Sequence, residues 1–246
     1  MNTGKEGSCM SRKFLGSGII FALWIVFIIL LKTFDVAPIG PEDTSVGFAT
    51  VNGAIHNMLG FNNTWYTISK LFGYVSILGA VLMALYGVYM IVRKRHIMKV
   101  DHALLATYVL YFAVIVIYIL FEVVIINYRP VIMPGEEHVE ASFPSSHTML
   151  GMVFNGSFFL LIQRYVKDRK MCRILSIVTG VLLVASVLSR LFSGVHWFTD
   201  ILGGVWISTV LLLAYDGALD EVDKRRRRKK RKKKKEAASA PEQNNG

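Results

Sequence analysis

The chain has 246 residues, of which 53% are hydrophobic and only 18% are charged. Soluble domains contain about 25% charged residues, so this chain has too few to cover a surface exposed to water. The composition excludes a soluble globular enzyme, a disordered chain and a small disulfide-stabilised domain, and it indicates a protein that crosses a membrane several times.

The net charge of +11 is concentrated in one run near the C-terminus. Twelve consecutive basic residues extend from Lys224 to Lys235, and the rest of the chain is close to neutral. Runs of like charge are usually solvated and disordered, so we expect residues 216–246 to form a disordered polybasic tail in the cytoplasm. The run suits a topology anchor or a contact with anionic lipids of the inner leaflet. Nucleic acid is a weaker candidate partner, because no aromatic residue interrupts the run.

Six apolar segments predict the membrane spans. They are residues 14–31, 71–92, 103–126, 149–162, 174–188 and 201–213. The first is expected to be retained, because no small-residue cleavage site follows it. The last three are short for about 30 Å of hydrocarbon, but helices can continue through polar residues that face a protein-enclosed cavity. We therefore predict an all-α fold, a bundle of six transmembrane helices over residues 14–215.

The basic residues predict the orientation of this bundle. With six spans, 24 of the 28 Lys and Arg residues fall on one side of the membrane, which the positive-inside rule assigns to the cytoplasm. Both termini, including the short segment 1–13, are then cytoplasmic. Within the long first outer loop, residues 47–59 are expected to form a short helix that lies at the membrane interface.

Phosphate-binding chemistry is concentrated at the outer ends of the third to sixth spans. Arg129 and Arg190 supply fixed positive charges whose geometry suits phosphate oxygens. Ser145 and Ser146 open the fourth span, where hydroxyls and unpaired backbone N–H groups form a seat for an anion.

Proton-transfer and nucleophilic groups are expected at the same depth. His147 follows the two serines and is suited to giving or taking a proton. His196 and Asp200 are four residues apart and share a helix face, so the carboxylate can hold one imidazole nitrogen and leave the other free to attack.

Each of these residues also has an ordinary structural interpretation. An Arg-Pro pair such as that at Arg129 often marks a helix end. Ser145, Ser146 and Asp200 are suited to helix capping, and the two histidines to an interfacial position. Their concentration at one face of a membrane bundle favours a functional site, because ionisable groups at such depth are usually functional.

Together these residues resemble the signature of the type 2 phosphatidic acid phosphatase superfamily. The family pattern is Lys-x6-Arg-Pro, then Pro-Ser-Gly-His, then Ser-Arg-x5-His-x3-Asp. The corresponding parts of this chain are Arg129-Pro130, Pro144-Ser145-Ser146-His147, and Ser189-Arg190 with His196 and Asp200. The order, the spacing of the third part and the six-span setting agree, and the resemblance extends over about a third of the chain.

The resemblance implies a two-step mechanism that uses no metal and no cofactor. His196 would attack phosphorus to form a phosphohistidine, and Asp200 would orient it. His147 would protonate the leaving group and then activate water. The phosphate oxygens would be held by Arg129, Arg190, Ser145 and backbone amides near Ser146. These arginines would supply the positive charge that Mg²⁺ supplies in other phosphoryl-transfer enzymes.

Two positions depart from the family pattern. Ser146 replaces the glycine, which is a mild change because serine also caps helices. Glu122 replaces the lysine and reverses its charge. On a continuous helix Glu122 shares a face with Arg129, so it would pair with Arg129 and orient it, repel a highly charged substrate, or stay protonated near the interface.

A lipid phosphatase of a bacterial cell membrane, with its site on the extracytoplasmic face, is the function that the resemblance implies. The substrate class is phosphatidic acid, phosphatidylglycerophosphate, a lysolipid phosphate or a polyprenyl diphosphate such as undecaprenyl diphosphate. One alternative is an impaired relative that only binds lipid phosphates, which Glu122 favours. Another is a transporter, because buried charges also suit transport, although transport sites lie near the bilayer centre.

Overall fold

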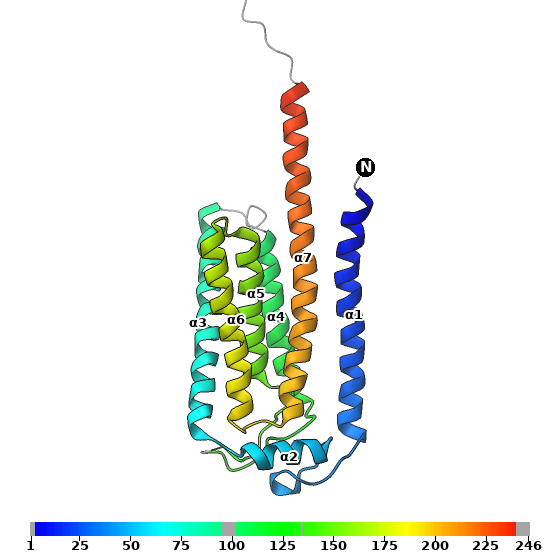
Figure 1. The fold of residues 1–246 in the computed structure, drawn as a ribbon, viewed down its shortest axis with the longest axis vertical. Coiled ribbons are helices and arrows are strands. Elements are labelled where there is room, and N and C mark those ends of the chain that lie inside the picture. Colours follow the sequence, from blue (N-terminus) through cyan, green and yellow to red (C-terminus); the bar gives the residue numbers. More distant parts are fainter. Residues whose placement is uncertain (1–2, 95–101, 134, 240–246) are drawn as a thin grey trace, which may run out of the picture.

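In the computed structural model, residues 3–94, 102–133 and 135–239 are described, apart from the side chains of residues 3–11, 91, 94 and 233–239. Within these ranges the chain is all-helical, as predicted, with two isolated β-bridges and no strand. The helices are α1 (Thr3–Thr33), η1 (Pro41–Asp43), α2 (Ala49–Leu59), α3 (Asn63–Lys94), α4 (His102–Val123), α5 (Ser146–Tyr165), α6 (Arg169–Phe192) and α7 (Phe198–Ser239) (Figure 1).

Five helices of the described chain are long and apolar enough to cross a membrane: α1, α3, α4, α6 and α7. The structure is therefore that of a multi-pass membrane protein. Most of the apolar side chains on these helices point outward, as expected where the surrounding medium is lipid. The predicted segment 149–162 lies in α5, which does not reach the same hydropathy.

The composition of α5 follows from its central position in the bundle. It packs against α3, α4, α6 and α7, so little of its surface faces outward. Its polar side chains are buried inside the protein; Asn155 is 5% exposed and Ser157 is fully buried. The Asn155 side chain donates a 2.8 Å hydrogen bond to the Gly151 carbonyl. A helix enclosed by other helices needs no apolar surface, so a hydropathy criterion misses it.

The short helix predicted within residues 47–59 is confirmed as α2, and it lies across one end of the bundle (Figure 1). Asn52 fixes it to the start of α7. Its side-chain amide donates to Thr199 Oγ1 at 2.9 Å, and its carbonyl oxygen accepts from the Thr199 backbone N–H at 3.1 Å. This pair of bonds positions the loop between α6 and α7.

Helices α1 and α7 lie side by side and are joined by buried polar contacts (Figure 1). Ser17 Oγ donates to the Val210 carbonyl at 3.0 Å, and Trp24 Nε1 donates to the Gly203 carbonyl at 3.1 Å. A Cβ at Gly203 would lie 2.2 Å from the Phe143 ring, so only glycine lets this ring pack on the α7 backbone. Phe143 thereby anchors the segment that leads into α5.

The C-terminal tail differs from its prediction, because α7 continues as one helix to Ser239. The expectation of a disordered tail is wrong for residues 216–239, and residues 240–246 lie outside the described chain. Lys and Arg have high helix propensity. The first turns beyond the expected span are also stabilised by side-chain pairs, of which one joins Arg225 to Glu221 at 3.2 Å.

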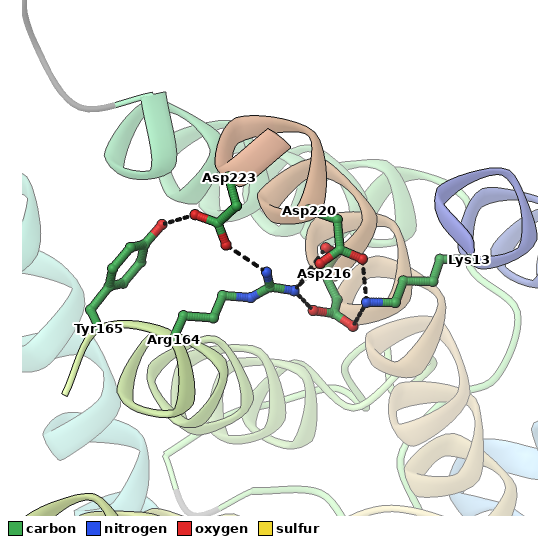
Figure 2. A network of polar contacts seen from close by, with 6 residues as sticks. All are labelled: Lys13, Arg164, Tyr165, Asp216, Asp220 and Asp223. Carbon is green, nitrogen blue, oxygen red and sulfur yellow. Dashed lines mark hydrogen bonds and ion pairs between the residues drawn. The ribbon is translucent and has the colours of Figure 1, made fainter. Parts of the chain in front are cut away.

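A cluster of ion pairs joins three helices at the end opposite α2 (Figure 2). Arg164 of α5 contacts Asp216, Asp220 at 2.7 Å and Asp223 at 3.0 Å. Lys13 of α1 contacts Asp216 at 2.6 Å and Asp220 at 2.5 Å. The three aspartates share one face of α7 because they are four and three residues apart. This ion cluster fixes α1 and α5 to α7.

Replacing Arg164 by Gln should destabilise the protein, because it leaves three neighbouring carboxylates with only Lys13 to balance them. We expect a loss of about 2 kcal/mol, between the values for exposed and for buried pairs. The measurement is thermal unfolding in detergent, followed by tryptophan fluorescence. Lys167→Gln, at an exposed position three residues along the chain, is the control. Equal midpoints for both variants and the wild type would contradict a stabilising role for the cluster.

Candidate active site

The predicted site residues meet at the end of the bundle that α2 covers (Figure 1). They come from separate elements: Glu122 at the end of α4, Arg129 in the following loop, Ser145, Ser146 and His147 at the start of α5, Arg190 in the last turn of α6, His196 in the loop before α7, and Asp200 in the first turn of α7. One narrow pocket there is lined by Glu122, Arg129, Ser146 and His196, together with residues 141–144.

His196 lies buried between a hydroxyl and a guanidinium. Its Nε2 is 3.0 Å from Arg190 Nη2, and its Nδ1 is 2.9 Å from Ser142 Oγ. Since a guanidinium can only donate, Nε2 must accept, and the imidazole proton therefore resides on Nδ1. Burial, together with the positive charges of Arg190 and Arg129, lowers the pKa of His196 well below its usual range. The imidazole is therefore neutral, and its Nε2 lone pair points at the arginine.

Ser142 lies between His196 and Asp200, which corrects the prediction that the carboxylate holds the imidazole directly. Ser142 Oγ donates to Asp200 Oδ2 at 2.5 Å. Its single proton is used in this bond, so the hydroxyl oxygen accepts the proton of His196 Nδ1. The connection from carboxylate to imidazole thus runs through one hydroxyl.

Asp200 is fully buried, and both of its oxygens accept hydrogen bonds. Besides Ser142, the donors are Asn127 Nδ2 at 2.9 Å and the Trp197 backbone N–H at 3.0 Å. The bond to Trp197 is the carboxylate half of a capping box, so the helix-capping interpretation also applies. Because both oxygens receive donors, the geometry fits the ionised, acceptor-only form.

Arg190 is a buried cation without a counter-ion among the described side chains. Its side chain is 1% exposed, and Nη1 donates to Ser69 Oγ at 3.2 Å. The guanidinium lies 5.7 Å from the centre of the Tyr66 ring. No carboxylate lies within ion-pair distance among the side chains that the structure describes, and Nε has no hydrogen-bond partner there. A buried charge without a partner is costly, so this arrangement is typical of a site that receives an anion.

Arg129 is paired with Glu140 rather than with Glu122. Its Nε lies 3.2 Å from Glu140 Oε2, and its backbone N–H donates to the Glu140 carbonyl at 3.0 Å. Glu122 is exposed, lies beside Tyr118, and faces the same pocket as Arg129. The possibility that Glu122 orients Arg129 through an ion pair is therefore not realised in the structure.

His147 stands in the first turn of α5 against the backbone of α3. A Cβ at Gly73 would lie 2.8 Å from His147 Cδ2, so the glycine allows the imidazole and α3 to touch. The Nδ1 atom of His147 is buried and has no hydrogen-bond partner in the described part of the chain. The positive charges of Arg190, Arg129 and Lys70 all disfavour a further positive charge on this imidazole.

Ser145 occupies the N-cap position of α5, but its hydroxyl makes no capping bond to the backbone. Instead it accepts from Thr148 Oγ1 at 3.0 Å, and its backbone N–H donates to the Asp200 carbonyl at 3.1 Å. The start of α5 is thus fixed to the start of α7.

Among the residues that sequence reasoning missed, four polar or aromatic ones hold Asp200 and Arg190. Ser142 and Asn127 hold Asp200, and both stand within two residues of the recognised motifs, which is a usable signal. Ser69 and Tyr66 contact Arg190 from α3. Nothing in the sequence pattern distinguishes them from other polar residues of that helix.

In the part of the chain with described side chains, no three His, Cys, Asp or Glu residues are grouped as metal ligands. The two arginines bring positive charge to the site, Arg190 beside His196 and Arg129 at the lining of the pocket.

Comparison with known proteins agrees with the motif order. Residues 122–217 match the family model of the PAP2 superfamily. Phosphatidylglycerophosphatase B of Bacillus subtilis (strain 168) is 33% identical over 98 residues, which are 39% of this chain and 48% of that protein. The matched stretch thus spans about half the length of this relative.

The fold is similar to a crystal structure described as the first transmembrane PAP2-type phosphatidylglycerolphosphate phosphatase from Bacillus subtilis. The TM-score is 0.56 and the identity 20%, and the superposition covers 85% of this chain and 96% of that one. At this identity the likeness concerns the fold alone. The sequence match and the motif order make residues 122–217 similar to the PAP2 superfamily.

Proposed function

We propose that the protein is an integral-membrane lipid phosphatase that works through a phosphohistidine intermediate. The observation that carries the proposal is the contact between the neutral Nε2 of His196 and the buried, carboxylate-free guanidinium of Arg190. A nucleophile and an anion-binding cation thus meet at one point. The PAP2-superfamily match and the name of the Bacillus subtilis relative support the same chemistry.

In the proposed reaction, the substrate phosphate takes over the hydrogen bonds of Arg190 and frees the Nε2 lone pair. His196 Nε2 bonds to phosphorus while the ester P–O bond breaks. His147, protonated once the bound phosphate anion offsets the neighbouring positive charges, gives its proton to the leaving alkoxide. The chain from Nδ1 through Ser142 to Asp200 stabilises the positive charge that develops on the imidazole. A water then attacks phosphorus, the P–N bond breaks, and His147 takes the proton of the water.

The phosphate oxygens are held by Arg190 and Arg129 in this proposal, with Ser145, Ser146 and the first N–H groups of α5 as further donors. Glu140 must release Arg129 when the phosphate arrives. Its side chain is 42% exposed, so it can turn toward water at little cost. The ion pair seen in the structure therefore represents the site before substrate enters.

An apolar groove supports a substrate with a lipid tail. The groove has a volume of about 440 Å³ and lies between α3, α4 and α5. Its lining includes Ser76 and Leu150, which stand one helical turn below Gly73 and His147. A chain in this groove would place its head group at the site. We propose a phospholipid monophosphate of the phosphatidylglycerophosphate or phosphatidic acid type, because Glu122 would repel the additional charge of a diphosphate.

We further propose that α5 also crosses the membrane, which gives six spans and places both termini in the cytoplasm. The asymmetric distribution of Lys and Arg supports this topology. The phosphatase domain then comprises residues 14–215, and the site faces the outer side. The basic continuation of α7 would meet anionic lipids of the inner leaflet with its first turns. A relative that binds lipid phosphates without hydrolysis is the second candidate, since Glu122 replaces a family cation.

Replacing His196 by Ala should abolish phosphate release from phosphatidic acid or phosphatidylglycerophosphate in detergent micelles, because no other group takes the nucleophile's place. EDTA should leave the wild-type rate unchanged. The measurement is inorganic phosphate released over time, and thermal unfolding shows that the variant is folded. Turnover by His196→Ala at the wild-type rate would remove the nucleophile assignment, and an inactive wild type would leave the binding relative as the better candidate.

Replacing Ser142 by Ala should lower kcat about 10- to 100-fold with little change in KM, because Ser142 holds the imidazole and leaves the phosphate-binding cations in place. Ser208→Ala removes an equally buried hydroxyl, which only bonds to the Gly204 carbonyl of its own helix, and serves as the control. An unchanged kcat in Ser142→Ala would show that the hydroxyl does not connect Asp200 to His196 during turnover.

A further inference from the structure

The exchange of the family lysine for Glu122 removes one positive charge from the α4 side of the site. Glu122 faces the pocket beside Arg129, and Arg129 is itself balanced by Glu140. A phosphate dianion that binds there meets one fully available cation, Arg190, where the family pattern provides three. The charge balance suggests that another cation completes the site.

Lys70, in the second turn of α3, is a cation that shares an aromatic neighbour with Arg190. Its Nζ lies 5.1 Å from the centre of the Tyr66 ring. The guanidinium carbon of Arg190 lies 5.7 Å from the centre of the same ring. Within the described part of the chain, no carboxylate lies within ion-pair distance of Lys70. Two cations that have no counter-ion among the described residues thus share one aromatic ring.

The residues next to Lys70 contact the catalytic groups directly. Ser69 is 2% exposed and accepts the hydrogen bond from Arg190. Gly73, three residues later, packs against the imidazole of His147. Lys70 therefore stands on α3 between a contact to the phosphate-binding arginine and a contact to the acid–base histidine.

The side chain of Lys70 suits a cation that moves to its ligand. Its four-carbon stem is flexible, and its ammonium carries three donors without a fixed geometry. The contact with Tyr66 is weak enough to exchange for a phosphate oxygen, since a partly exposed cation–π pair is weaker than a charge-assisted hydrogen bond.

We propose that Lys70 is a phosphate-binding residue, which supplies from α3 the positive charge that the family pattern places at position 122 on α4. The proposal rests on the proposed function. In this site the phosphate would be held by Arg129 on one side of His196 and by Arg190 and Lys70 on the other. Glu122 can occupy the lysine position because the missing charge is supplied from another helix.

The test compares phosphate release by the wild type, Lys70→Ala, Glu122→Lys and the double variant Lys70→Ala/Glu122→Lys. We expect Lys70→Ala to lower kcat/KM about 10- to 100-fold, as for loss of one transition-state donor. In the double variant, the lysine at position 122 should restore at least 10% of the wild-type value. Wild-type turnover in Lys70→Ala, or a double variant no better than Lys70→Ala, would overturn the proposal.

Arg93→Ala is the matched control, because it removes a positive charge from the other end of the same helix. It should turn over at the wild-type rate. An equal loss in Arg93→Ala and Lys70→Ala would show a general effect of charge on α3 and would overturn the proposal.

A binding measurement separates this proposal from the proposed function. Inorganic phosphate should raise the thermal midpoint of the wild type in detergent, and the shift should be smaller in Lys70→Ala and unchanged in Arg93→Ala. If the wild type releases no phosphate from any lipid but shows this Lys70-dependent shift, the hydrolytic function fails and the binding role of Lys70 stands. A phosphate shift of equal size in Lys70→Ala would overturn that role, whatever the activity.

Discussion

The contact between Arg190 and His196 is the interaction on which the rest of the site depends. A buried guanidinium without a carboxylate is costly in a protein interior, and here it faces the lone pair of a neutral imidazole. Ser69 and the Tyr66 ring compensate only part of that cost, because neither carries a negative charge. A phosphate group would provide the missing charge beside His196 Nε2, the proposed nucleophile. The resting site is therefore complementary to a ligand that is both anionic and electrophilic.

The cations at the two ends of the bundle differ in whether carboxylates neutralise them. At one end, Arg164 and Lys13 are neutralised by three aspartates of α7, and the result is a connection between helices (Figure 2). At the other end, Arg190 and Lys70 have no carboxylate partner within the described chain. Helix α5 runs between both ends, so the ion cluster that fixes it to α7 also sets the position of His147. The paired charges thus connect the helices at one end of the bundle, and the cations without carboxylate partners lie at the other end.

Much of this arrangement could be predicted from the sequence, because hydropathy, loop charge and motif order are local signals. They located the apolar segments, the short helix α2 and the eight candidate residues. The Ser142 bridge could not be predicted, since the distance between Asp200 and His196 depends on the loop that precedes α7. Lys70 and Ser69 belong to a helix outside the motifs, and only packing brings them to Arg190. The helical tail was not predicted because the composition of the basic run indicates only its charge. It does not show that the aspartates of the ion cluster hold the helix that leads into this run.

The most direct test of the account is to identify the covalent intermediate. The wild-type protein would be mixed with a radiolabelled lipid phosphate, quenched within milliseconds in alkali, and digested for mass spectrometry. The account predicts a phosphoryl group on His196 that is stable in alkali and lost in acid, and that is absent when His196 is replaced. A phosphoryl group on His147 or on a serine would contradict it, as would hydrolysis with no phosphoenzyme at any quench time.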